Sequence, residues 1–309
     1  MIDQLPGAIE LGLIYSFMAL GVYITFRILD FPDLTVDGSY TTGGAIAAVM
    51  ITSGHSPFLA TLAAFGGGMA AGLCTGLLHT KGKINGLLSG ILMMIALYSI
   101  NLRIMGKPNV SLMGEDSLFT SVNPLLVMPF VVIAVKILMD LFLRTDLGLA
   151  LRATGDNARM IRSFGVNTDN TTILGISLAN GMVALSGALI AQYSTFADSS
   201  MGIGMIVIGL ASVIIGEAIF GTGSVFRATL AVVLGSIVYR IVVALALQVE
   251  WLEASDLKLI TALIVFVALV FPSIQRFLKQ KNTARKRTAE LAEQALIRKK
   301  GGAVDAKAR

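Results

Sequence analysis

Long apolar stretches recur along the whole chain, separated by short polar breaks. A helix needs about 20 predominantly apolar residues to cross a bilayer, and backbone in lipid is helical because its polar groups find no water there. Apolar spans are expected at residues 7–28, 40–52, 57–78, 87–105, 124–143, 171–193, 202–220, 225–247 and 257–271. Because the stretch at 40–52 is short and rich in Gly and Ala, the crossing number stays open. The pattern predicts an all-α polytopic membrane protein with about 8–10 transmembrane helices.

The composition excludes several classes of protein. Of the 309 residues, 55% are hydrophobic and 14% are charged, and the mean hydropathy is +0.79. A soluble domain carries about 25% charged residues. Intrinsic disorder, nucleic-acid binding and an ordinary cytosolic enzyme are therefore excluded, and the lipid bilayer is the first expected partner.

The positive charges predict the orientation in the membrane. Loops on the cytoplasmic side carry the excess of Lys and Arg. One set of alternate loops holds most of the basic residues: 79–86, 144–170 and 221–224, followed by the C-terminal segment. The opposite set holds Lys107 as its only Lys or Arg: 53–57, 106–123, 194–201 and 248–256. We expect a multi-pass protein of the inner (cytoplasmic) membrane, with the loop at 144–170 and the C-terminus in the cytoplasm.

The C-terminal segment differs from the rest in charge. From Arg276 to Arg309 there are eleven Lys and Arg residues against three acids. A basic segment next to a membrane is attracted to anionic lipid. The expected organisation is a transmembrane domain at 1–275 and a basic cytosolic tail at 276–309.

No motif for nucleotide binding or catalysis occurs. The two Gly-Lys pairs, at 82–83 and 106–107, are followed by Ile84 and Pro108, so neither continues into the Ser or Thr of a P-loop. A single cysteine, Cys74, permits no disulfide within the chain, and the two histidines lie at opposite ends of one span. We expect no catalytic site, no metal site and no cofactor bound by the chain itself.

Polar residues are rare inside the predicted spans and are candidates for function. Four could meet a small zwitterion or polyol on a translocation pathway: Asp37, Ser39, Asn101 and Asn180. The alternative for these four is hydrogen bonding between packed helices. Lys136 and Asp140 are four residues apart on one predicted helix and can pair.

Glycines at four-residue spacing predict a helix contact. Gly68, Gly72 and Gly76 lie on one face of the span at 57–78. Small residues at this spacing let two membrane helices approach closely. We expect a packing role for this face.

The loop at 144–170 contains a second helical pattern. A short helix is expected at Asn157–Phe164, with Thr154 or Asp156 as its N-cap and Gly165 ending it. A helix of two turns is not stable alone in water, so it needs a partner for its apolar face.

This short helix has two distinct faces. Met160, Ile161 and Phe164 form the apolar face, and Arg159 and Arg162 form a basic edge. The apolar face could lie on the bilayer surface, or it could dock on a cytosolic protein that drives transport.

Three parts of the chain carry a family resemblance. They are Gly155–Asp169, Leu34–Ser39 running into Gly43–Ala45, and Val213–Glu217 followed by Gly221–Ser224. Together they resemble the permease subunits of bacterial ABC importers, in the group that carries branched-chain amino acids, ribose-type sugars and related solutes. The resemblance covers residues 10–275. The form of Thr35–Ser39 is similar to that of a subgroup associated with aromatic amino acid (tryptophan or tyrosine) uptake.

The resemblance implies a transport mechanism. The chain would be the permease subunit of a binding-protein-dependent importer for a small solute, most simply a branched-chain or aromatic amino acid, working by alternating access. Its partners would be a cytosolic ABC ATPase that binds the ATP, an extracytoplasmic solute-binding protein, and a second permease copy or a paralogue. The residues implied in coupling to the ATPase are Arg152, Gly155, Asp156, Asn157, Arg159, Met160, Arg162, Phe164 and Gly165. A stand-alone secondary transporter or channel is the alternative.

Overall fold

The computed structural model describes residues 5–120 and 124–247, with the single positions 259, 262, 263, 266 and 270. The chain divides into two units, Met1–Val265 and Phe266–Arg309, and the fold below is that of the first unit. The span expected at 257–271 falls largely outside the described residues, and the tail expected at 276–309 falls entirely outside them.

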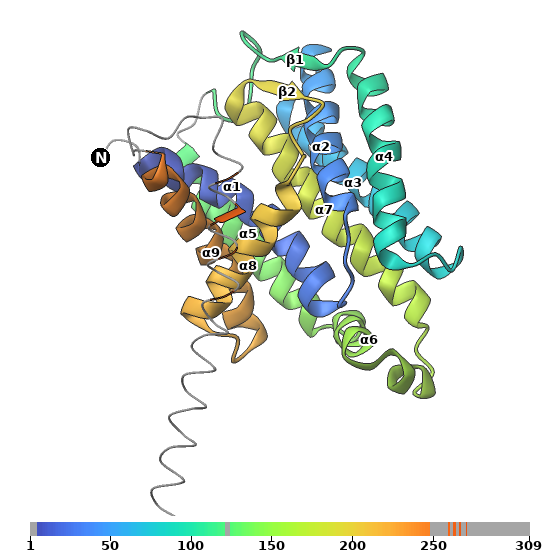
Figure 1. Ribbon diagram of the computed structural model, residues 1–309. Coiled ribbons are helices and arrows are strands. Elements are labelled where there is room, and N and C mark those ends of the chain that lie inside the picture. Colours follow the sequence, from blue (N-terminus) through green and yellow to red (C-terminus); the bar gives the residue numbers. More distant parts are fainter. Residues whose placement is uncertain are drawn as a thin grey trace, which may run out of the picture. The chain divides into compact units, whose positions relative to one another are not determined.

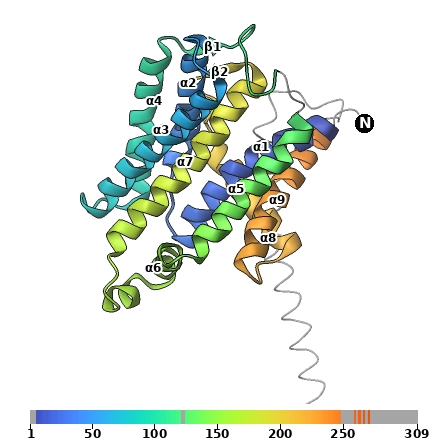
Figure 2. The same cartoon turned by 180° about the vertical axis from the view of Figure 1, so that it is seen from behind.

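The described residues form nine α-helices, one π-helical turn and two short strands. In chain order these are α1 (Leu5–Tyr23), η2 (Ile24–Ile28), α2 (Thr35–Thr52), α3 (Pro57–Thr80), α4 (Gly86–Met105), β1 (Asn109–Ser111), α5 (Pro124–Arg144), α6 (Asp146–Ser163), α7 (Thr168–Ser194), β2 (Phe196–Asp198), α8 (Met205–Phe220) and α9 (Val225–Ala246). In Figures 1 and 2, α6 lies at one end of the bundle and the two strands lie at the other. We call these the α6 end and the sheet end.

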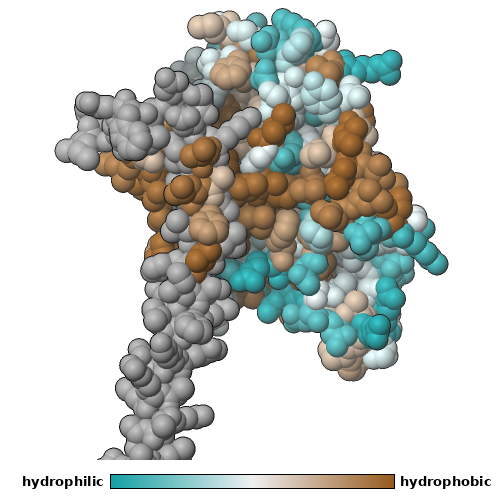
Figure 3. Space-filling view, in the orientation of Figure 1, coloured by the Kyte–Doolittle hydropathy of each residue, from teal (hydrophilic) through white to brown (hydrophobic). Residues whose placement is uncertain are grey.

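Six of the helices are long and apolar enough to cross a membrane: α1 with η2, α3, α4, α5, α7 and α9. Helix α8 is apolar but shorter than these six. Helix α2 is less apolar because its first turns contain polar residues. Figure 3 shows a hydrophobic band across the middle of the bundle, with hydrophilic surface towards both ends. The predicted all-α polytopic membrane fold is confirmed.

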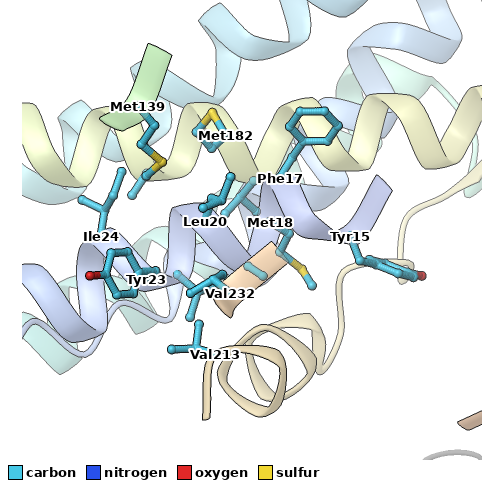
Figure 4. Close-up of a cluster of buried hydrophobic side chains, with 14 of the residues drawn as sticks. Tyr15, Phe17, Met18, Leu20, Tyr23, Ile24, Met139, Met182, Val213 and Val232 are labelled. Atoms are coloured by element: carbon cyan, nitrogen blue, oxygen red, sulfur yellow. The ribbon is translucent and has the colours of Figure 1, made fainter. Parts of the chain in front are cut away.

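Helix α1 lies at the centre of the main core. Its hydrophobic residues point in all directions, which is typical of a helix surrounded by others, and Phe17, Met18 and Leu20 are completely buried. Figure 4 shows side chains from four neighbouring helices around it: Met139 of α5, Met182 of α7, Val213 of α8 and Val232 of α9. The absence of a polar face on this sequence is therefore explained by its position.

Helices α3 and α7 pack closely through glycine. A Cβ atom on Gly68 would overlap Asn180, and one on Gly72 would come within 2.5 Å of the Ile176 carbonyl oxygen. At Gly76 the distance to the Ile173 Cα would be 2.9 Å. These three glycines therefore lie against the backbone of α7.

Helix α2 begins earlier than its sequence suggests. The apolar span was expected from residue 40, with a polar break before it, but the helix runs from Thr35. The Asp33 carboxylate accepts a hydrogen bond from the Thr35 backbone N–H (2.9 Å), and the Thr35 hydroxyl meets that of Thr75 on α3 (2.8 Å). Polar residues can begin this helix inside the bundle because neighbouring helices supply their partners.

The two strands are an addition that apolar periodicity did not predict. They come from the loops expected at 106–123 and 194–201 and pair antiparallel, with Val110 opposite Ala197. Both of these side chains are buried in a small cluster with residues of α2. The short sheet ties two loops together at one end of the bundle.

Candidate functional site

Helix α6 is two helices joined at a kink. Asn157 has an extended backbone (φ −158°, ψ 89°), and its side chain accepts a hydrogen bond from the Met160 N–H (3.0 Å). Asn157 is thus the N-cap of the second half, so the expected caps, Thr154 and Asp156, were wrong. The first half of α6 was expected to be loop, but it is helical from Asp146. Thr145 is its N-cap, because the Thr145 hydroxyl accepts a hydrogen bond from the Gly148 N–H.

The second half of α6 ends at glycine as expected. Gly165 has φ +87°, the left-handed conformation that glycine adopts most readily. The Gly165 N–H donates to the Arg162 carbonyl and the Val166 N–H donates to the Ile161 carbonyl. This pair of bonds is the Schellman arrangement that closes a helix C-terminus.

The first half of α6 is packed against the bundle. Leu151 is fully buried, and the Thr154 hydroxyl hydrogen-bonds to that of Thr171 on α7 (2.9 Å). A Cβ on Gly155 would overlap the Ile28 carbonyl oxygen at the end of η2. Gly155, expected to couple the chain to a partner, is therefore the point where α6 contacts the end of the first membrane helix.

The second half of α6 is tied to the start of α7 by Arg162. Its guanidinium donates to the Thr168 hydroxyl and to the Asp169 carboxylate, and Lys81 lies 3.8 Å from the same carboxylate. The α6 segment is thus held to the bundle at both ends.

Between these attachments the segment presents apolar side chains outward. Met160 is 51% exposed and Phe164 is 75% exposed, whereas Ile161 is half-buried. The basic and acidic side chains of Arg152, Asp156 and Arg159 are also exposed. The result is a surface with an apolar centre and charged surroundings, on a segment attached to the bundle at both ends.

The four polar residues proposed for a pathway separate into two places. Ser39 and Asn180 belong to a buried hydrogen-bond network: the Ser39 hydroxyl donates to Asn180 Oδ1 (2.7 Å), and Asn180 Nδ2 donates to Asp33 (2.6 Å). All three side chains are fully buried. This network joins α2 to α7 and fits the alternative of helix packing.

Asp33 was not singled out from the sequence. Burial raises the pKa of its carboxyl group, and hydrogen bonds from Thr35 and Asn180 offset part of that rise. The sequence did indicate this residue as a candidate, because its carboxylate lies in the short break between two apolar spans. Its partners could not be foreseen, because Asn180 is 147 positions away.

Asp37 and Asn101 line one cavity of about 400 Å³ between α2, α4 and the segment before α8. The Asp37 carboxylate accepts from the backbone N–H of Gly204 (2.9 Å) and of Ile206 (2.8 Å). It satisfies N–H groups that the start of α8 leaves open. Asn101 Nδ2 donates to the Gly38 carbonyl oxygen (3.2 Å).

Two further ion pairs involve residues of the membrane helices: the first lies within α5, and the second joins η2 to α8. Lys136 and Asp140 of α5 pair at 2.6 Å as expected, both almost fully buried, and Asp140 also accepts from Thr229 of α9. At the α6 end, Arg27 of η2 donates to both carboxylate oxygens of Glu217 on α8. The second pair was missed because its members are far apart in sequence.

In the part of the chain that the structure describes, no cluster of His, Cys, Asp and Glu has the geometry of a metal site.

Comparison with known proteins gives consistent results. A family model described as a branched-chain amino acid transport system permease component matches residues 7–270. A tyrosine transport system permease protein of Clostridioides difficile is 48% identical over 272 residues, covering 88% of this chain and 92% of that protein. An autoinducer 2 import system permease protein of Salmonella paratyphi B is 27% identical, covering 92% and 86% of the two chains.

One solved structure shows the same fold. A chain of PsaBC from Streptococcus pneumoniae, in complex with Fab, has a TM-score of 0.55 at 13% identity and covers 91% of this chain and 100% of its own. At that identity the likeness concerns the fold alone.

Proposed function

The chain belongs to the family of branched-chain amino acid transport permeases, the membrane-spanning subunits of ABC importers, and on this premise we propose that it carries an aromatic amino acid such as tyrosine. The solute is suggested by the 48% identity to a tyrosine transport permease over most of both chains. The chain is a pore subunit without catalytic activity, and family membership decides against a stand-alone carrier. ATP is bound by a separate partner in this proposal.

The contact for the ATPase is the second half of α6, Asn157–Gly165. The observation that supports this is the exposure of Met160 and Phe164 on a segment that is anchored at both ends. A partner that covers these side chains gains apolar burial, and the anchors let it push on α7 and on the end of η2. Arg152, Asp156 and Arg159 surround the apolar centre and would set its orientation.

The other partners and the orientation follow from the charges. The α6 end carries the basic loops, so we place it and the C-terminus in the cytoplasm of a cell with the chain in its inner membrane. The sheet end carries Glu115, Asp116 and Asp198, where an extracytoplasmic solute-binding protein would deliver the solute. A second copy or a paralogue would complete the pore, with residues 1–275 in the membrane and 276–309 as the basic tail.

Copurification tests the contact with the ATPase. The importer is purified from native membranes in mild detergent, with wild-type chain, Phe164→Asp, or Phe196→Asp as a matched control at the sheet end, where Phe196 is also exposed. Burial of a Phe side chain stabilises by about 1.5–3 kcal/mol, so Phe164→Asp should reduce ATPase recovery about tenfold or more. Equal recovery with all three chains would refute the docking surface.

Uptake tests the solute. Proteoliposomes with the complete importer and ATP should accumulate labelled tyrosine, and unlabelled phenylalanine or tryptophan should compete better than leucine or ribose. Competition by leucine alone would contradict an aromatic solute and leave the permease role intact.

A further inference from the structure

The cavity beside Asn101, of about 400 Å³, lies between α2, α4 and the segment before α8. It is lined by Asp37, Gly38, Thr41, Met94, Ile95, Tyr98, Asn101, Ser199 and Ile203. The residues from α4 come from the middle and the second half of that helix, which is one of the six helices long and apolar enough to cross a membrane. Binding sites of many transporters lie beside a helix that begins within the helix bundle, and α8 begins here at Met205, against Asp37 of α2.

Asn101 offers an unused acceptor to this cavity. Its side chain is completely buried. Since the Gly38 carbonyl oxygen can only accept, the amide nitrogen must face it, and this fixes the amide orientation. Oδ1 then has no hydrogen-bond partner among residues 5–120 and 124–247. A buried acceptor without a partner is costly, so a donor from a ligand would be bound favourably.

The other polar side chains that line the cavity are the Asp37 carboxylate, which accepts when ionised, and the hydroxyls of Thr41, Tyr98 and Ser199, which can accept or donate. The Asp37 carboxylate already accepts from backbone N–H groups at the start of α8, those of Gly204 and Ile206 among them; an ionised carboxylate has about four acceptor sites, which leaves further acceptor capacity. The Thr41 hydroxyl is already engaged: it donates to the Asp37 carbonyl oxygen (3.2 Å) and accepts from the Gly202 N–H (3.1 Å). Among residues 5–120 and 124–247, no Lys, Arg or His lines the cavity. The site is therefore suited to a cationic group with several N–H donors.

The remaining wall is apolar. Met94, Ile95, Tyr98 and Ile203 line it, and the Tyr98 ring is half exposed. Aromatic rings pack favourably against one another and against the sulfur of methionine. The wall is therefore suited to an aromatic side chain.

We propose that this cavity binds the α-ammonium group of the solute through Asn101 Oδ1 and the Asp37 carboxylate, with the solute side chain against Tyr98. The assignment rests on the proposed import of an aromatic amino acid and deepens it by naming the recognised group. Asn101 and Asp37 then determine selection for a free amine, and Tyr98 determines selection for an aromatic ring.

Cysteine protection tests the site directly. Cys74, which is exposed, is replaced by Ser, and Ile95→Cys is introduced as a reporter at the cavity. Leu92→Cys, one turn away on the same helix and outside the cavity lining, is the matched control. A permeant maleimide labels both in membranes that contain the complete importer. Tyrosine at ten times its half-protecting concentration should slow labelling of Ile95→Cys about tenfold and leave Leu92→Cys unchanged.

Ligand analogues and variants separate the recognised groups. Tyramine, which keeps the amine, should protect; N-acetyltyrosine, which lacks it, should not. Asn101→Leu should raise the half-protecting concentration of tyrosine about 10- to 100-fold, as expected for a lost hydrogen bond to a charged group. Unchanged labelling of Leu92→Cys in that background shows that α4 keeps its place. Tyr98→Ala, at a half-exposed position, should weaken protection by tyrosine and leave protection by alanine unchanged.

The outcomes distinguish this site from the proposed function. If the importer accumulates tyrosine but tyrosine does not protect Ile95→Cys, or protects equally in Asn101→Leu, the site is refuted and the function stands. If another free amino acid is imported and protects, with the same dependence on Asn101, the aromatic solute is refuted and the recognition of the amine stands. Protection by N-acetyltyrosine as strong as that by tyrosine would overturn the role of the ammonium group.

Discussion

The buried ion pair between Lys136 and Asp140 predicts a large difference between single and double substitution. The two charged atoms are 2.6 Å apart, and the side chains are 5% and 7% exposed. At an effective dielectric constant of about 20, this distance corresponds to roughly 6 kcal/mol of attraction. Burying each ion costs several kcal/mol, so the pair as a whole is close to neutral for stability.

Removing one partner keeps one burial cost and loses the attraction. Lys136→Met should therefore destabilise the chain by about 3–5 kcal/mol. The double variant Lys136→Met, Asp140→Leu removes both charges. Its free energy of unfolding should be within about 1 kcal/mol of the wild-type value, or higher than it. In that variant the Thr229 hydroxyl can donate its one proton to the backbone oxygen of Val225 or of Phe226 instead, so it is not left without a partner.

Thermal unfolding in detergent measures both effects. At about 2–4 °C per kcal/mol, the single variant should melt about 6–20 °C below the wild type. Lys81→Met is the control, because its pair with Asp169 is exposed and should contribute less than about 1 kcal/mol. A single variant as stable as the wild type, or a double variant as unstable as the single one, would refute the reasoning.

Three further predictions concern close contacts and titration. Gly72→Ala should lower the free energy of unfolding by about 1–3 kcal/mol, because the added methyl group overpacks the α3–α7 contact. Gly66→Ala on the same helix, where the space around the glycine is open, should raise the free energy of unfolding by about 0.5–1 kcal/mol. Equal melting temperatures of the two variants would contradict this. Gly155→Ala should displace α6 from η2 and increase proteolysis near Asn157, and an unchanged digestion pattern would oppose the contact with Ile28. Because burial raises the pKa of Asp33, the folded state holds its proton to higher pH than the unfolded state. The stability of the wild type should therefore fall relative to that of Asp33→Asn as the pH rises above about 4, and parallel curves would argue against this.

Most of the helices could be predicted from sequence because their signals are local. Apolar length alone located six long spans, and the spacing of Gly68, Gly72 and Gly76 placed them on one helix face, which lies against α7. Gly165 could be identified as a helix end because few other residues adopt its left-handed conformation readily.

The site needed the fold because its contacts join distant parts of the chain. Asp37 accepts from Gly204, which is 167 positions away, and nothing near Asp37 in sequence indicates this partner. The same applies to the division of four polar residues into a buried network and a cavity. Sequence could place Asn101 and Asn180 in spans, and Asp37 and Ser39 in the polar break before one, but only the helix arrangement decides which of them have partners.

The sequence by itself thus determined that this chain is a helical membrane protein, which end of it is basic, and that a short helix with one apolar face begins near Asn157. Those properties depend on hydrophobic length, charge and helix capping, which neighbouring residues set. The tertiary structure alone decided where α2 begins, how α6 is anchored, and that Asn101 and Asp37 meet at one cavity. These depend on hydrogen bonds and close packing between helices, which form only when segments far apart in the chain come together.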